Sequence, residues 1–75
     1  MLIDWVDSCS DPGWQNSADC KAHLLTCQSV GFVVEETEDI ICIALNRSTK
    51  KGYTPFGELM SIPKVAITRR KKIKI

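Results

Sequence analysis

Two apolar runs separated by a short acidic segment constrain the fold of this chain more than any other feature. The runs cover residues 30–34 and 40–45, and their β-branched side chains recur with a period of two, which is typical of strands rather than of a helix. Residues 35–39 between them carry four carboxylates, which would lose their hydration if they were buried. The sequence therefore predicts a β-hairpin with an exposed acidic turn.

A short helix is predicted before the hairpin, over residues 18–28. Asn16 and Ser17 are favourable N-cap residues, and Asp19 would complement the helix dipole in the first turn. One narrow apolar stripe would run along this helix, formed by Cys20, Leu24 and Cys27. Trp14 precedes the helix and is expected to cover the core, because large aromatic side chains supply much of the burial in a small domain.

Extended segments complete the expected fold. Period-two patterns predict strands at residues 2–6, 58–62 and 65–67, with a corner at Pro63, which cannot donate a ladder hydrogen bond. Apolar residues lie on both sides of the hairpin, so both faces of the sheet need cover. We therefore expect an α+β domain in which one short helix packs on a strongly bent antiparallel sheet of about five strands.

The length of 75 residues suits one small domain, which we expect to span residues 1–75. Such a chain buries only about 60–65% of its unfolded surface, so its core is small. No apolar run approaches the roughly 20 residues of a membrane-spanning helix, and the first residues lack the basic segment of a signal peptide. We therefore expect a cytoplasmic protein that does not enter a membrane.

Charge is divided unevenly along the chain. Residues 1–39 hold eight acids and one base, a net charge of −7, whereas residues 40–75 hold nine bases and one acid, a net charge of +8. Opposite charges on the two halves can guide self-assembly or present one charged face to a partner. Together with the small core, this asymmetry predicts a homo-oligomer, most simply a dimer.

The basic residues near the C-terminus are the strongest indication of a partner. Residues 68–75 are predicted to form a basic C-terminal strand or tail, in which four cations follow one another. Such cations can contact the phosphates of a nucleic acid or a nucleotide, pair with the acidic half of a neighbouring protomer, or remain solvated. A polar loop at residues 48–57 adds lysines and aromatic rings, which either contact a partner or fold back on the core edge. The candidate binding residues are Lys64, Arg69, Arg70, Lys71, Lys72, Lys50, Lys51, Tyr53 and Phe56.

Patterns for catalysis and metal binding are weak in this sequence. Cys20, His23 and Cys27 would lie along the predicted helix and suit zinc, but no fourth ligand is close to them. His23 is the only histidine, and no nucleophile motif or phosphate-binding glycine loop accompanies it. We therefore predict a protein that is not an enzyme and holds no metal or cofactor. Its four cysteines are expected to stay reduced.

Three short motifs carry a resemblance to known proteins. They read Trp5-Val6-Asp7-Ser8, Val30-Gly31-Phe32-Val33-Val34-Glu35 and Ile62-Pro63-Lys64-Val65-Ala66-Ile67. Together they resemble short proteins encoded by tailed bacteriophages and prophages, a group that implies no established activity. The hairpin and the Ile62-Pro63-Lys64 corner also resemble Sm-like small barrels, which implies a small half-barrel of the Sm or SH3 type.

These observations leave three functions open. The first is a non-catalytic, phage-encoded accessory protein that binds a host macromolecule or a defence component. The second is a small-barrel nucleic-acid-binding protein that uses the basic C-terminus. The third is an oligomeric sink for an anionic nucleotide ligand. Salt separates the first two, because binding to nucleic acid weakens steeply with salt, whereas an apolar protein interface does not.

Overall fold

The computed structural model describes residues 1–49, 51–52 and 55–74. Two short 3-10 turns occur in this part of the chain, Ser17–Asp19 (η1) and Lys64–Ala66 (η2). The remaining regular elements are the strands β1 (Leu2–Asp7), β2 (Leu25–Val30), β3 (Phe32–Glu36), β4 (Ile40–Arg47), β5 (Phe56–Pro63) and β6 (Ile67–Lys71).

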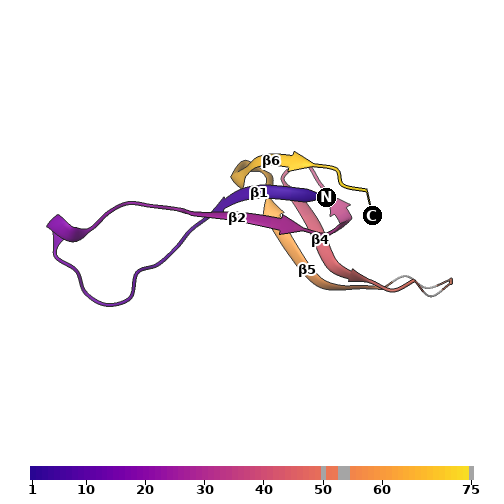
Figure 1. Cartoon of the computed structure of the whole chain (residues 1–75), viewed down its shortest axis with the longest axis horizontal. Helices are drawn as coiled ribbons and strands as arrows, with labels where there is room; N and C mark the ends of the chain where they lie inside the picture. Colours follow the sequence, from indigo (N-terminus) through magenta and orange to yellow (C-terminus); the bar gives the residue numbers. More distant parts are fainter. Residues whose placement is uncertain (50, 53–54, 75) are drawn as a thin grey trace.

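The strands form two three-stranded sheets in which all neighbours are antiparallel. One sheet has the order β2-β1-β6, and the other has the order β3-β4-β5. Figure 1 shows β1, β2 and β6 above the long β4 and β5 strands, so that the two sheets cross. The N-terminal and C-terminal strands of the chain thus meet in one sheet, and the central strands form the other.

The α+β half-barrel predicted from the sequence is wrong, because residues 18–28 do not form a helix. Within that range the described structure holds only the end of η1 and the start of β2. All six residues of β2 pair with β1, and its half-buried positions Cys27 and Ser29 alternate as in a strand. The helical spacing of three apolar residues gives only a weak local preference for a helix. Pairing along the whole of β2 outweighs that preference. The prediction of one sheet of about five strands is also wrong, because the structure has two three-stranded sheets.

The central hairpin with its acidic turn is confirmed. β3 and β4 pair antiparallel, and the turn between them is made by residues 37–39. The hydroxyl oxygen of Thr37 accepts hydrogen bonds from the backbone N–H groups of Asp39 and Ile40, at 3.3 and 3.1 Å. The carboxylates of the turn are exposed, as their hydration requires.

Gly31 carries the chain from one sheet to the other. It lies between the end of β2 and the start of β3, and it is buried. A Cβ atom at this position would lie 2.7 Å from the backbone oxygen of Ala44. Only glycine therefore lets the connection pass this close to β4, and the bend of the chain depends on that approach.

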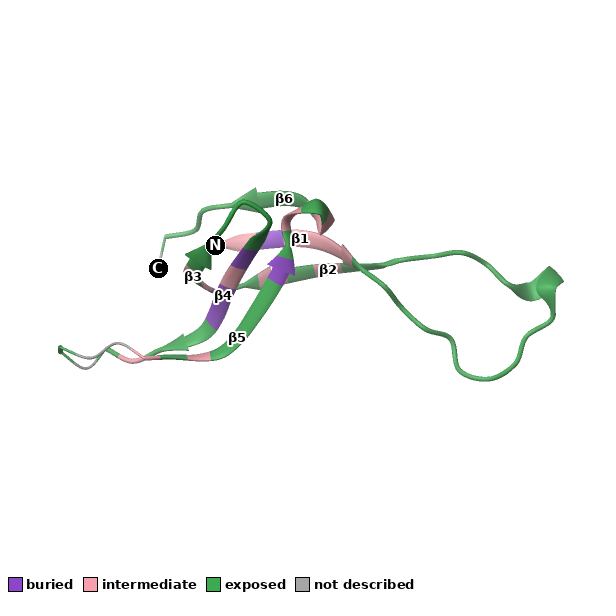
Figure 2. Cartoon of the chain, turned by 180° about the vertical axis from the view of Figure 1, so that it is seen from behind, coloured by how far each residue is buried: buried purple, intermediate pink, exposed green. Residues whose placement is uncertain are grey.

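The core is small and lies between the two sheets (Figure 2). It is formed by the buried side chains Ile3, Ile41, Ile43 and Ile62, with Met1, Trp5 and Ile67 packed against them. These isoleucines come from β1, β4 and β5, so the core joins both sheets. A small core was expected for this length, and burial of each isoleucine stabilises the fold by about 1.5–3 kcal/mol.

The molecule is long and narrow, with extents of 58 × 23 × 21 Å. Its radius of gyration is 16.5 Å, compared with about 11 Å for a compact domain of this length. Residues 8–24, here called the arm, project from the β1–β2 end, whereas the far ends of β4 and β5 extend in the opposite direction (Figure 1). Much of the chain therefore lies outside the packed body.

Candidate binding surfaces

The predicted basic residues of η2 and β6 are largely paired with acids of the same chain. The Nζ atom of Lys64 lies 2.7 Å from Oε2 of Glu36, and Nη1 of Arg70 lies 2.9 Å from the same oxygen. The Nε atom of Arg69 lies 3.0 Å from Oδ2 of Asp4. These three cations therefore form ion pairs within the fold, and the carboxylates partly neutralise their charge.

The pKa of Glu36 reflects this pairing. The hydrogen bond from Lys64 lowers the pKa most, and the hydrogen bond from Arg70 lowers it further. Glu36 ends β3, Lys64 opens η2 and Arg70 belongs to β6, so one carboxylate joins elements of both sheets. The ion pairs of Glu36 with Lys64 and Arg70 therefore help to hold the two sheets together.

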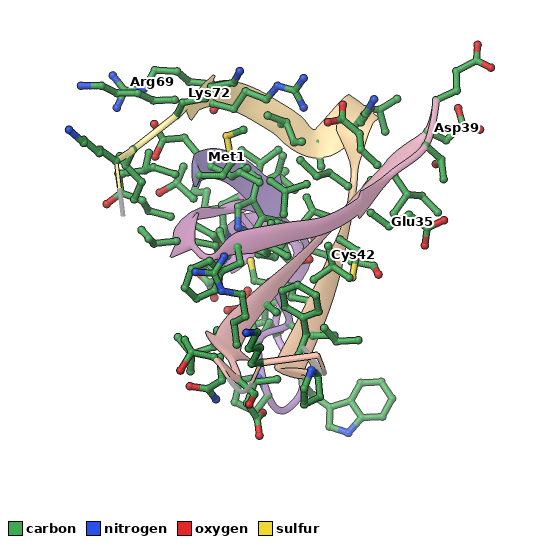
Figure 3. The ribbon with its side chains drawn as sticks, turned by 90° about the vertical axis from the view of Figure 1, so that its right-hand side faces the viewer. Met1, Glu35, Asp39, Cys42, Arg69 and Lys72 are labelled. Carbon is green, nitrogen blue, oxygen red and sulfur yellow. The ribbon has the colours of Figure 1, made fainter. Side chains whose placement is uncertain are left out.

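Two further candidates, Lys71 and Lys72, lie at the end of β6 and just after it, and both are exposed. Figure 3 shows Arg69 and Lys72 pointing outward from this strand, on the side away from Glu35 and Asp39. An open groove of about 340 Å³ adjoins the strand and is lined by Lys64, Ile67, Thr68, Arg69 and Arg70. The structure thus gathers these candidates into one basic strip, formed by Lys64 and residues 69–72.

The loop candidates lie away from the basic strip. Lys50 and Tyr53 lie outside the described residues, Lys51 is in an exposed turn, and Phe56 opens β5 opposite Arg47. This end of the β4–β5 hairpin is distant from β6 (Figure 1). The sequence-predicted binding residues therefore divide between two separate regions.

The structure also has an apolar groove, and none of the binding residues predicted from the sequence lines it. It has a volume of about 330 Å³ and lies between the end of β2 and the strands β4 and β5. Its lining residues are Ser29, Val30, Ile43, Leu45, Glu58, Leu59 and Met60. Leu45 and Leu59 are 65% and 59% exposed, and Val30 and Met60 are also exposed. The alternating apolar residues on both faces of the hairpin were the sequence signal for such a surface.

A short chain of hydrogen bonds and one residue with a left-handed backbone conformation belong to the surroundings of the apolar groove. Trp5 donates its Nε1–H to the hydroxyl oxygen of Ser29 at 3.0 Å, and that hydroxyl donates to the sulfur of Met60 at 3.8 Å. Glu58 has a φ of 58°, a left-handed conformation that costs a residue with a side chain about 1–3 kcal/mol. Strained backbone of this kind concentrates at binding sites. The groove is therefore a candidate contact surface.

Trp14 is fully exposed in the arm, and the expectation that it covers the core is wrong. The two limbs of the arm are linked nearer the body, where Cys9 donates its S–H to the backbone oxygen of His23 at 3.5 Å. The Nε2 atom of His23 also lies 3.7 Å from Oδ1 of Asp11. These contacts hold the arm as an extended loop that presents its indole to solvent.

The structure does not bring the considered metal ligands together. Cys20 lies in the arm, with its S–H donated to the backbone oxygen of Asn16 at 3.4 Å, while Cys27 belongs to β2. Among the described residues, no group of three or more His, Cys, Asp or Glu side chains is placed to hold a metal ion.

No protein-family model, curated protein or solved structure matches this chain. In the described part of the chain, no helix has both the length and the apolar character that crossing a membrane requires. The function is therefore inferred from the shape and charge of the apolar groove, the arm and the basic strip.

Proposed function

We propose that this chain is a non-catalytic binding protein whose partner is another protein, held at the apolar groove. The observation that carries the proposal is the set of exposed apolar side chains that line the groove, Val30, Leu45, Leu59 and Met60. Contiguous apolar surface of this kind marks contact sites, because its burial releases about 25 cal/mol per Å². The resemblance to short phage proteins suggests a host protein, such as a defence component, in the bacterial cytoplasm.

The position of the apolar groove suits a protein contact. Its lining residues belong to three strands, so the surface is held by paired backbone rather than by a loop. Charged residues are depleted in the centre of protein interfaces, and Glu58 is the only charged residue among the described residues that line the groove. A partner would therefore find a mostly apolar centre with polar residues around it.

Nucleic-acid binding is a second candidate, favoured by the exposed side chains of Lys71 and Lys72. The basic strip is a weaker site than its sequence suggests, because Arg69 is paired with Asp4 while Lys64 and Arg70 are paired with Glu36. A phosphate chain would have to compete with these carboxylates. The same argument applies to an anionic nucleotide in the 340 Å³ groove beside β6.

Capture from a bacterial lysate with matched variants tests the proposal. Immobilised wild-type chain and Val65→Glu should retain the same protein, because Val65 is exposed outside the apolar groove. Leu59→Glu should lose it, since a charge in the groove loses hydration on binding. Retention should persist from about 0.1 M to about 1 M salt, where the Debye length falls from about 10 to about 3 Å. Capture that fails in high salt, or after Lys71→Ala with Lys72→Ala, would favour the basic strip instead.

A further inference from the structure

Two apolar features without a covering element lie on this one chain, and they suit each other. Trp14 extends from the arm with its indole fully exposed. The apolar groove has a volume of about 330 Å³, near the lower limit of pockets that hold small molecules, so it has room for an aromatic ring. Tryptophan buries about 150–250 Å² when it packs and is enriched among the residues that dominate binding energy.

The charges around the two features are complementary. The arm, residues 8–24, holds Asp11 and Asp19 against Lys21, a net charge of −1. Residues 45–58, which include the groove residue Leu45, hold three bases and one acid, a net charge of +2. An acidic arm is therefore attracted to the region beside the groove, and this favours its approach and orientation.

The shape of the molecule indicates which copy of the arm fits. The arm and the far end of the β4–β5 hairpin extend in opposite directions along a molecule 58 Å long (Figure 1). The arm of a chain therefore points away from its own hairpin end. A second copy turned by 180° and lying alongside would place each arm at the hairpin end of the other. Such a two-fold arrangement closes on itself and satisfies both contacts at once.

We infer that the chain forms a two-fold dimer in which Trp14 of each protomer enters the apolar groove of the other. This inference rests on the proposed function, since it names a second copy as an occupant of the same groove. The exchange also enlarges the small buried core, which is a common means of stabilising short chains. A host protein would then compete with the second protomer's arm for the groove.

Light scattering on the full chain and three variants tests the dimer. Wild type and Val65→Glu should show twice the 8.4 kDa mass of one chain at micromolar concentration. Trp14→Ala and Leu59→Glu should each show the mass of a single chain. Because both side chains are exposed in the protomer, circular dichroism should report the same strand content for all four proteins. A monomeric wild type, or variants that dimerise like it, would overturn the inference.

Mixing the two monomeric variants distinguishes exchange from closure within one chain. Trp14→Ala keeps its groove and Leu59→Glu keeps its arm, so a mixture should form a heterodimer with one intact contact and weaker affinity than wild type. A mixture that stays monomeric up to its solubility limit contradicts the reciprocal arrangement. If the chain captures a lysate protein but does not self-associate, the dimer is overturned and the proposed function stands. If the chain forms the dimer but captures nothing, the proposed function is overturned and the dimer stands.

Discussion

Lys64 and Glu36 form the shortest ion pair described in this fold, with 2.7 Å between Nζ and Oε2. The pair joins η2, the connection between β5 and β6, to the end of β3. Arg70 reaches the same oxygen at 2.9 Å. A single carboxylate thus receives one cation from η2, which connects the sheets, and one from β6, and it restrains how the sheets cross.

Glu36→Gln should lower the midpoint of thermal unfolding modestly, because it removes the charge that two cations share. The loss should shrink at high salt, since these side chains are partly exposed and their attraction is screened. Scanning calorimetry at low and high salt measures the change. Glu35→Gln is the matched control, because Glu35 is an exposed neighbour on β3 for which no ion pair is described.

The stabilisation by Glu36 should depend on pH in a defined direction. Its cations hold its pKa in the folded chain below the usual 4.5. A group with a lowered folded pKa contributes stability above its unfolded pKa, and that contribution is lost as the pH falls toward the folded value. The difference in unfolding free energy between wild type and Glu36→Gln should therefore be constant above about pH 5.5 and decline below about pH 4.5. A difference that increases on acidification would contradict this role.

Gly31→Ala should destabilise the fold by about 1–3 kcal/mol, the usual cost of overpacking. The added Cβ would lie 2.7 Å from a backbone oxygen of Ala44, and backbone cannot move aside as a flexible side chain can. Gly57→Ala is the control, because its Cβ would meet Asn46 at an ordinary 3.7 Å. Urea denaturation of the two variants compares them, and equal losses would show that the crossing tolerates a side chain.

Ile41→Ala should destabilise the chain by about 2–5 kcal/mol, a large part of the stability of so small a domain. Ile41 is fully buried and belongs to the core between the sheets. The adjacent Ile40→Ala should lose about 1 kcal/mol or less, because Ile40 is 44% exposed. Urea midpoints for the pair measure the contrast. Similar losses at the two positions would mean that the core is not at the described register.

The hairpin could be predicted because its causes are local. Period-two apolar residues specify paired strands, and the turn is stabilised by Thr37, which bonds to residues two and three positions away. The strand β2 could not be predicted in this way. Its partner residues in β1 lie 18 to 28 positions earlier in the chain, and residues 20–27 also fit a helical stripe. Local preference alone could not choose between the two structures.

For the candidate binding surfaces too, the sequence determined the local features and the tertiary structure decided the contacts between distant segments. The sequence by itself determined which residues are basic, that the turn is acidic, and that apolar residues occur on both faces of the hairpin. Only the tertiary structure decided that Arg70 meets Glu36, 34 residues away, and that side chains of three strands line one groove. It also decided that Trp14 stays outside the core. Such contacts depend on strand pairing between distant segments, and residue pattern within a segment does not specify which distant segments will meet.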